Sequence, residues 1–157
     1  MIVVADTTPL NYLVLIDEIE LLPAIFGTVL IPEAVLRELL HPKTPAKVRE
    51  WIGSPPKWLE VRAVVAEMLP QLMDLDPGER EAIQLALEVG ADAILIDEAD
   101  GRRHAERLQL EVRGTLGVLE RAAKLGKTDL LSALDRLDKT SFRLSPALRA
   151  AFLKRNY

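Results

Sequence analysis

The sequence of 157 residues contains no cysteine and only two histidines, His41 and His104. Without cysteine the protein can form neither disulfides nor thiolate metal sites, so we expect it in a reducing cytoplasm. The two histidines lie far apart in the sequence and lack the helical spacing of a paired zinc site. We therefore expect both histidines on the solvated surface.

Long apolar runs are also missing from the sequence. No run approaches the roughly 20 residues that a membrane-spanning helix needs. The residues before Asp6 lack the basic region that opens a signal peptide, so we expect neither a signal peptide nor a membrane contact. With 49% hydrophobic and 28% charged residues the composition is typical of a globular protein, and the length suits a single domain over residues 1–157.

The net charge of −4 does not indicate a nucleic-acid-binding protein, since such domains are often basic. A cluster of metal-binding acids would, however, contribute negative charge that bound cations cancel. Basic residues gather in two places, which are Arg102, Arg103 and Arg107, and then Arg143, Arg149, Lys154 and Arg155. These residues form either solvated helix faces or phosphate contacts beside an acidic centre.

Short runs rich in Val, Ile and Leu alternate with helical patterns along the chain. The predicted strands are residues 2–6, 28–31, 58–62, 93–96 and 111–113. This alternation, with short connections, predicts a three-layer α/β fold in which helices flank a central, mainly parallel five-stranded sheet. The core is expected to cover about residues 2–125, and residues 126–157 to form a helical extension.

Several residues mark where the helices should begin or end. Thr7 or Thr8 is expected as the N-cap of the first helix, and Gly90 as the C-cap of a helix over residues 77–89. Thr128 and Ser145 are the expected N-caps in the C-terminal extension.

Four carboxylates occupy positions that an α/β fold brings together. Asp6 and Asp97 each end a short apolar run that precedes a helical pattern, and Glu38 and Glu79 lie on predicted helices. Ligands of parallel sheets bind beyond the carboxyl ends of the strands. The four acids therefore form a candidate divalent-cation pocket, which indicates metal-assisted phosphodiester chemistry.

Each acid also has a structural interpretation. Asp6 could serve only as a turn residue or as a partner of the dipole of the following helix. An unpaired aspartate after an apolar strand is, however, costly to bury. Glu38 lies at the border of an apolar helical stripe, where a glutamate is usually solvated. Glu79 fits a capping box that has Asp76 as its N-cap.

Asp97 has competitors nearby in the sequence. Its position resembles that of Asp6, but Glu98 and Asp100 could share or replace its role. Taken singly, these signals are weak. The metal-site interpretation depends on the joint placement of the acids at one edge of a parallel sheet.

Four segments, in this order, resemble the motifs of PIN-domain nucleases. The matching segments are VVADTTPL at residues 3–10 for the first acid, LIPEAVLREL at 30–39 for the second, GEREAI at 78–83 with ALEVGAD at 86–92 for the third, and ILID at 94–97 for the fourth. The resemblance covers about residues 2–125. The Gly78-Glu79 pair and the GTLG segment at 114–117 are similar to a prokaryotic branch related to VapC-type toxins. The toxin members more often carry aspartate as the third acid, so Glu79 departs from them.

The resemblance implies a Mg²⁺- or Mn²⁺-dependent endoribonuclease that cleaves single-stranded RNA, with a role as the toxin of a toxin–antitoxin pair. Both ions are hard and prefer carboxylate and water oxygens. The metal-binding and catalytic candidates are Asp6, Glu38, Glu79 and Asp97, with Asp100 as a further metal ligand. Thr7 or Thr8 would orient Asp6 or contact phosphate. The RNA-binding candidates are Arg102 and Arg103.

Other functional classes fit less well. A haloacid-dehalogenase-type phosphatase needs a second aspartate two residues after its nucleophile, where this chain has Thr8. A phosphoacceptor receiver domain needs an acid pair after the first strand and a lysine after the fifth, and the predicted strands are followed by neither. The main alternative is a non-enzymatic PIN-like module that binds RNA or a protein partner.

The resemblance also implies partners. Chains of this family commonly form homodimers, and toxin-type members are held inactive by an antitoxin segment that covers the acidic groove. The apolar helical face of Leu21, Leu22, Ile25 and Phe26 is compatible with either dimerisation or burial in the core. We expect a homodimer that acts on RNA and has an antitoxin protein as its partner.

Overall fold

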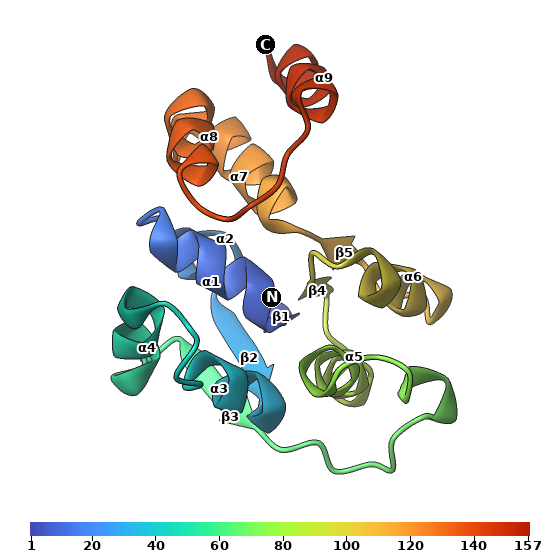
Figure 1. The fold of residues 1–157 in the computed structure, drawn as a ribbon. Coiled ribbons are helices and arrows are strands. Elements are labelled where there is room, and N and C mark those ends of the chain that lie inside the picture. Colours follow the sequence, from blue (N-terminus) through green and yellow to red (C-terminus); the bar gives the residue numbers. More distant parts are fainter.

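The computed structural model describes all 157 residues and has a sheet of five strands at its centre (Figure 1). The strands are β1 (Ile2–Ala5), β2 (Thr28–Pro32), β3 (Leu59–Arg62), β4 (Ala93–Leu95) and β5 (Val112–Arg113). They lie in the order β3-β2-β1-β4-β5, and every neighbouring pair is parallel. The predicted five-stranded, mainly parallel sheet is confirmed, and in the structure it is entirely parallel.

Helices cover both faces of this sheet. They are α1 (Thr7–Leu15), α2 (Leu21–Phe26), α3 (Glu33–Leu39), α4 (Ala46–Gly53), α5 (Pro77–Val89), α6 (Ala99–Arg107), α7 (Thr115–Lys124), α8 (Leu130–Asp138) and α9 (Pro146–Asn156), with the short 3₁₀ helix η1 (Pro70–Leu72) before α5. The result is the predicted three-layer α/β fold. None of these helices combines the length and the apolar character that crossing a membrane requires.

The two faces of the sheet bury separate apolar clusters because successive strand residues point to opposite sides. Val3 and Ala5 of β1 join the larger cluster, to which α1–α4 and the C-terminal helices α7–α9 contribute. Val4 joins the smaller cluster, which is built mainly from α5, α6 and the segment around η1. Residues of the C-terminal extension, including Phe152, therefore share the larger core with the strands.

The order of the strands determines where a ligand site can form. From β1 the chain passes to β2 and β3 on one side and then crosses to β4 on the other side. Open α/β sheets bind ligands at such a switch in strand order, outside the carboxyl ends of the strands. Asp6 directly follows β1, and Asp97 follows β4 after one intervening residue. Two of the four predicted acids thus lie at the switch point.

The helix caps show both correct and wrong predictions. Gly90 is the C-cap of α5 in the left-handed conformation, with φ 61° and ψ 48°, and the Ser145 hydroxyl caps α9 by accepting from the Leu148 N–H at 3.1 Å. The prediction for Thr128 is wrong, because Asp129 is the N-cap residue of α8. The Thr128 hydroxyl instead donates to Glu18 at 2.9 Å.

The predicted cap of the first helix is also wrong. The N-cap residue of α1 is Asp6, and Thr7 is already helical. The strand geometry explains this shift, since the Asp6 backbone N–H donates to the Leu95 carbonyl of β4 at 2.9 Å and is still held by the sheet. The Thr7 hydroxyl, which has no capping role here, bonds to Glu38 instead.

The apolar face considered for dimerisation belongs to the core. Leu21, Leu22 and Phe26 of α2 are buried within the larger cluster, and Ile25 packs against it. These side chains therefore give no support to the expected homodimer, which stays a prediction.

Candidate active site

Asp6 lies at the centre of the candidate site. Its side chain is only 3% exposed, although it has no cationic partner. Burial raises the pKa of the Asp6 carboxyl to about 7, although a hydrogen bond with the Thr7 backbone lowers this pKa. The negative charges of Glu38, Asp76 and Asp97 raise this pKa further. Several carboxylates therefore act electrostatically on one buried aspartate.

Glu38 reaches the site from α3 and is half-buried. The Thr7 hydroxyl donates to Glu38 Oε2 at 2.6 Å, which fixes the carboxylate beside the end of β1. Gly78, in the first turn of α5, makes room for this arrangement. A Cβ atom on Gly78 would lie 2.4 Å from Glu38 Oε1 and 3.2 Å from Asp6 Oδ1, so the two carboxylates border the same small space.

Glu79 enters the site from the N-terminus of α5 and is 7% exposed. Its backbone N–H donates to Asp76 Oδ1 at 2.8 Å, which confirms Asp76 as the N-cap. The reciprocal bond of a capping box, from the Asp76 N–H to the Glu79 carboxylate, is not formed. Burial raises the pKa of the Glu79 carboxyl, and a side-chain hydrogen bond with Asp76 and the charges of Asp76, Asp6 and Glu98 raise it further. The Glu79 carboxyl therefore holds a proton more tightly than an exposed glutamate does.

Asp97 is held by the start of α7. Its Oδ1 accepts from the Thr115 N–H at 2.7 Å, and its Oδ2 accepts from the Thr115 hydroxyl at 2.7 Å. Burial raises the pKa of Asp97, while the two bonds from Thr115 and the nearby charge of Arg102 lower it, and the net change is upward. A Cβ atom on Gly114 would lie 2.7 Å from both Asp97 Oδ1 and Arg102 Nη1, so the guanidinium lies next to this carboxylate.

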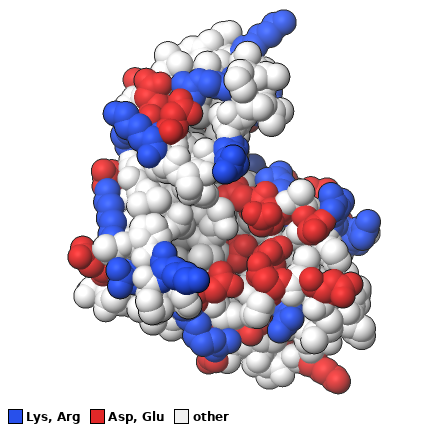
Figure 2. Space-filling model, viewed as in Figure 1, with Lys and Arg blue, Asp and Glu red and all other residues white.

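The structure brings the four predicted acids to one edge of the sheet, with Thr7 beside Glu38 and Arg102 beside Asp97. Figure 2 shows acidic side chains gathered in a hollow on this face, with basic side chains near its margin. Asp100 and Arg103 do not join the group, because they pair with each other on an exposed part of α6. Neither residue has a hydrogen bond or ion pair with any of the four acids.

Sequence reasoning missed some residues that shape the site. Asp76 was interpreted only as a cap, yet its charge acts on both Asp6 and Glu79. Thr115 was not singled out, although it follows β5 at the carboxyl edge of the same parallel sheet. Thr115 thus shares with Asp6 and Asp97 a position shortly after a parallel strand. The histidines take no part, since His41 is exposed and His104 Nδ1 bonds to the Asp100 carbonyl.

The residues of the site suit a hard divalent cation. No three acidic or histidine side chains converge as a preformed ligand cage. Mg²⁺ rarely needs such a cage, because proteins usually bind it through one or two carboxylates together with water and substrate phosphates. Asp6 and Glu38, which border one space beside Gly78, offer two carboxylates of this kind. The raised pKa of Asp6 shows the electrostatic cost that a cation would relieve.

Comparisons with known proteins agree with this architecture. A family model described as a PIN domain matches residues 2–156. A solved structure, of a PilT N-terminus domain protein from the hyperthermophilic archaeon Sulfolobus solfataricus P2, is similar over 92% of this chain and 100% of that chain, with a TM-score of 0.52 and 16% identity. This likeness concerns the fold alone. No significant match was found among curated proteins. Because the family model spans nearly the whole sequence, the chain belongs to the PIN-domain family.

Proposed function

We propose that this protein is a Mg²⁺- or Mn²⁺-dependent endoribonuclease that hydrolyses phosphodiester bonds of single-stranded RNA. The observation that carries the proposal is the group of Asp6, Glu38, Glu79 and Asp97 at the carboxyl edge of the sheet, where Asp6 is buried without a cationic partner. The PIN domain is a nuclease-type module, which supports the same reaction class. In this proposal residues 1–157 act as one domain, since the C-terminal helices share the larger core.

The acidic side chains have different roles in this proposal. A bound divalent ion would supply an activated water and neutralise charge on the phosphate. Asp6 and Glu38 would hold the ion, and the Thr7 hydroxyl would keep Glu38 in position. Asp97, oriented by its two bonds from Thr115, would complete the negative edge of the site. Glu79 would retain its proton in the hydrogen bond with Asp76 until a cation or substrate changes the local charge.

The second candidate is a catalytically inactive PIN-like module that binds RNA or a protein. Two observations favour this candidate. No three carboxylates converge on one point, and each oxygen of Asp97 already accepts one hydrogen bond from Thr115. The toxin role, an antitoxin partner, a homodimer and a cytoplasmic location all stay predictions from the resemblance.

A cleavage assay separates the two candidates. Purified protein is incubated with a mixture of single-stranded RNAs and Mn²⁺ or Mg²⁺, with and without a chelator, beside an identically prepared Asp6→Asn variant. Cleavage by the wild type that the chelator and the substitution both abolish would support the nuclease. Cleavage that persists in the variant would show contamination, and no cleavage of any RNA would favour the binding module.

Metal binding should also stabilise the fold. With about 10 mM Mn²⁺ and a dissociation constant of about 0.1–1 mM, the free energy of unfolding should rise by roughly 1.4–2.7 kcal/mol. The reason is that the cation binds the crowded carboxylates of the folded state and not the unfolded chain. Urea unfolding with and without Mn²⁺ measures this difference. An equal gain in the Asp6→Asn variant would place the bound metal elsewhere.

A substitution at Gly78 should change the position of the Glu38 carboxylate with little change in the stability of the fold. In Gly78→Ala the new methyl group would displace the Glu38 carboxylate, whose oxygen lies 2.4 Å from the Cβ position. Because the displaced atoms end a flexible side chain and alanine favours helices, the unfolding free energy should change by less than about 1 kcal/mol. Mn²⁺ affinity, measured by titration calorimetry, should fall by about tenfold or more.

The matched control is Gly53→Ala in α4, where a Cβ atom meets nothing within 4 Å. This control should leave Mn²⁺ affinity unchanged. Equal affinities of the Gly78→Ala variant and the wild type would mean that Glu38 takes no part in metal binding.

A further inference from the structure

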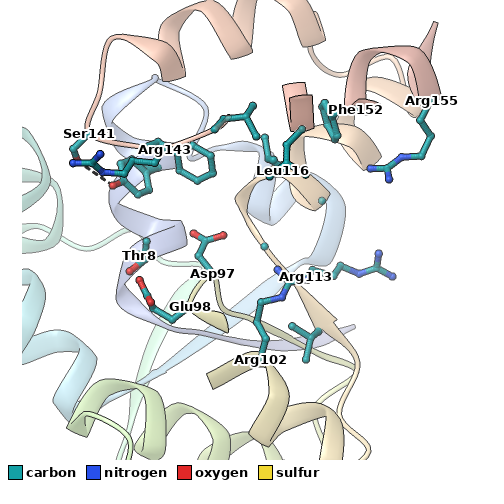
Figure 3. A pocket seen from close by; sticks show the side chains of 17 residues that line it. Thr8, Asp97, Glu98, Arg102, Arg113, Leu116, Ser141, Arg143, Phe152 and Arg155 are labelled. Carbon is teal, nitrogen blue, oxygen red and sulfur yellow. Dashed lines mark hydrogen bonds between the residues drawn. The ribbon is translucent and has the colours of Figure 1, made fainter. Parts of the chain in front are cut away.

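A cavity of about 690 Å³ opens beside Asp97 and reaches the C-terminal segment (Figure 3). One wall includes Asp97 and Glu98, which follow β4, and Thr8 of α1. The opposite wall comes from residues 141–155, which form the connection after α8 and most of α9. The volume lies in the range of pockets that bind small organic ligands. The cavity therefore extends the acidic site toward a part of the chain that the acid motifs do not include.

Part of the positive charge in this cavity has no acidic partner. Arg102 lies beside Asp97, and Arg155 is bound by Glu120, whereas Arg113 and Arg143 form no ion pair. The Nε atom of Arg113 is buried without a hydrogen-bond partner. Three guanidinium groups from α6, β5 and the connection after α8 thus surround one space. Guanidinium groups recognise phosphate through paired N–H donors.

Aromatic side chains lie beside these charges. Tyr12 of α1 and Phe142 both line the cavity, with ring centroids 5.0 Å apart and ring planes at 90°. The Tyr12 hydroxyl and Ser141 Oγ are hydrogen-bonded at 2.9 Å, which ties the C-terminal connection to α1. Figure 3 shows Arg143 next to Ser141 on one side of the cavity and Asp97 facing its interior. The tie holds Phe142 and Arg143 in place near the acidic site.

We propose that this cavity binds one nucleotide of single-stranded RNA next to the bond that is cleaved, with its base against Phe142 and Tyr12 and its phosphate at Arg143. The inference rests on the proposed function, since it places the nucleotide beside Asp97. Bases stack on aromatic rings without strict sequence preference, and free arginines supply the matching charge for the backbone. An acidic peptide would satisfy the arginines but would leave the aromatic surface without a planar partner. The combined chemistry therefore favours RNA over a protein segment.

The test measures binding without cleavage. A fluorescently labelled short single-stranded RNA is titrated with the Asp6→Asn protein in Mg²⁺, and anisotropy gives the dissociation constant. Arg143→Ala and Phe142→Leu are compared with two controls in the same background. Arg121→Ala removes an exposed arginine that forms no ion pair and lies outside the cavity, and Phe142→Tyr keeps the aromatic ring.

Arg143→Ala should weaken RNA binding about tenfold and reduce the salt dependence of log K by about one phosphate contact. Phe142→Leu should weaken binding about tenfold by removing the stacking surface. Both controls should stay within about twofold of the parent. In competition, a nucleoside monophosphate should displace the RNA better than inorganic phosphate does, because only the nucleotide has a base to stack.

Other results would overturn the inference. If Arg143→Ala and Arg121→Ala lost RNA affinity equally, the effect would come from general surface charge. If inorganic phosphate displaced the RNA as well as the nucleoside monophosphate does, base stacking would be excluded. Binding of polyglutamate that depends on Arg143, with RNA binding unaffected, would make the cavity a protein-docking site. If the wild type cleaves RNA and the cavity variants bind RNA normally, only the proposal for the cavity fails. If RNA binding depends on Arg143 and Phe142 but the wild type cleaves no RNA, the proposed nuclease activity fails and the proposal for the cavity stands.

Discussion

The Asp6→Asn substitution should lower the rate of metal-dependent RNA cleavage by about a thousandfold or more, because it removes the central carboxylate of the proposed metal site. Asp6 is the acid on which the charges of Glu38, Asp76 and Asp97 all act, so its loss changes the whole group. Asparagine keeps the shape of the side chain but cannot supply the negative charge. Single-turnover cleavage of a labelled RNA in Mn²⁺ measures the loss.

Asp74→Asn provides a matched control for this experiment. Asp74 is an exposed aspartate shortly before α5 and makes no hydrogen bond or ion pair. Its substitution should change the cleavage rate by less than about twofold, since surface changes of this kind alter little. If both variants cleaved at similar rates, Asp6 would not be catalytic and the nuclease proposal would fail.

The second large effect concerns the pH dependence of stability in the metal-free protein. The folded state holds the Asp6 proton up to about pH 7, whereas the unfolded chain releases it near 3.8. Between these values the folded state binds more protons, so the free energy of unfolding falls as the pH rises. The shift of about three pKa units corresponds to a loss of up to about 4 kcal/mol, complete above about pH 7.

The Asp6→Asn variant lacks this proton linkage. Without metal at about pH 8, it should be more stable than the wild type by about 1–4 kcal/mol, and the difference should shrink toward about pH 4. Chemical unfolding at several pH values in the presence of a chelator measures both proteins. A variant that unfolds more easily than the wild type at about pH 8 would show that ionised Asp6 stabilises the fold and that the site is not built for a cation.

The stability of the same two proteins should depend on metal to different degrees. The wild type gains stability when a cation neutralises its carboxylates, so its loss at high pH should be partly reversed by Mn²⁺. The variant has less charge to neutralise and should gain little. Agreement between this result and the cleavage loss would connect the electrostatic cost at Asp6 to the proposed chemistry.

The PIN fold and the edge that carries the acids could be predicted from the sequence because both depend on local patterns. Runs of β-branched and apolar residues alternate with helical patterns, and this alone predicts parallel strands. Parallel strands end at the same edge, so Asp6 and Asp97 could be placed together from their positions after two strands. The segment from Asp76 to Gly90 was equally predictable, because its N-cap, its helix and its C-cap are all set by nearby residues.

Side-chain partners across the fold could not be predicted in this way. The Thr7 hydroxyl donates to Glu38, which lies 31 residues away in the sequence, and Thr115 donates to Asp97, which lies 18 residues away. The sequence instead suggested Thr7 as a helix cap or as a partner of Asp6 or phosphate, and it suggested Asp100 and Arg103 as site residues. Asp100 and Arg103 are three residues apart on one exposed helix and form an ion pair with each other.

The sequence by itself therefore determined the parallel sheet, the edge at which a ligand can bind and the presence of acids along it, because periodicity and strand ends are local properties. Only the tertiary structure decided which acids are buried, which threonines bind Glu38 and Asp97, and where the C-terminal connection lies. The bond between Tyr12 and Ser141 joins residues 129 positions apart, and it holds one wall of the cavity beside Asp97. Such contacts arise when helices pack on a shared core, and no pattern within a single helix or strand specifies them.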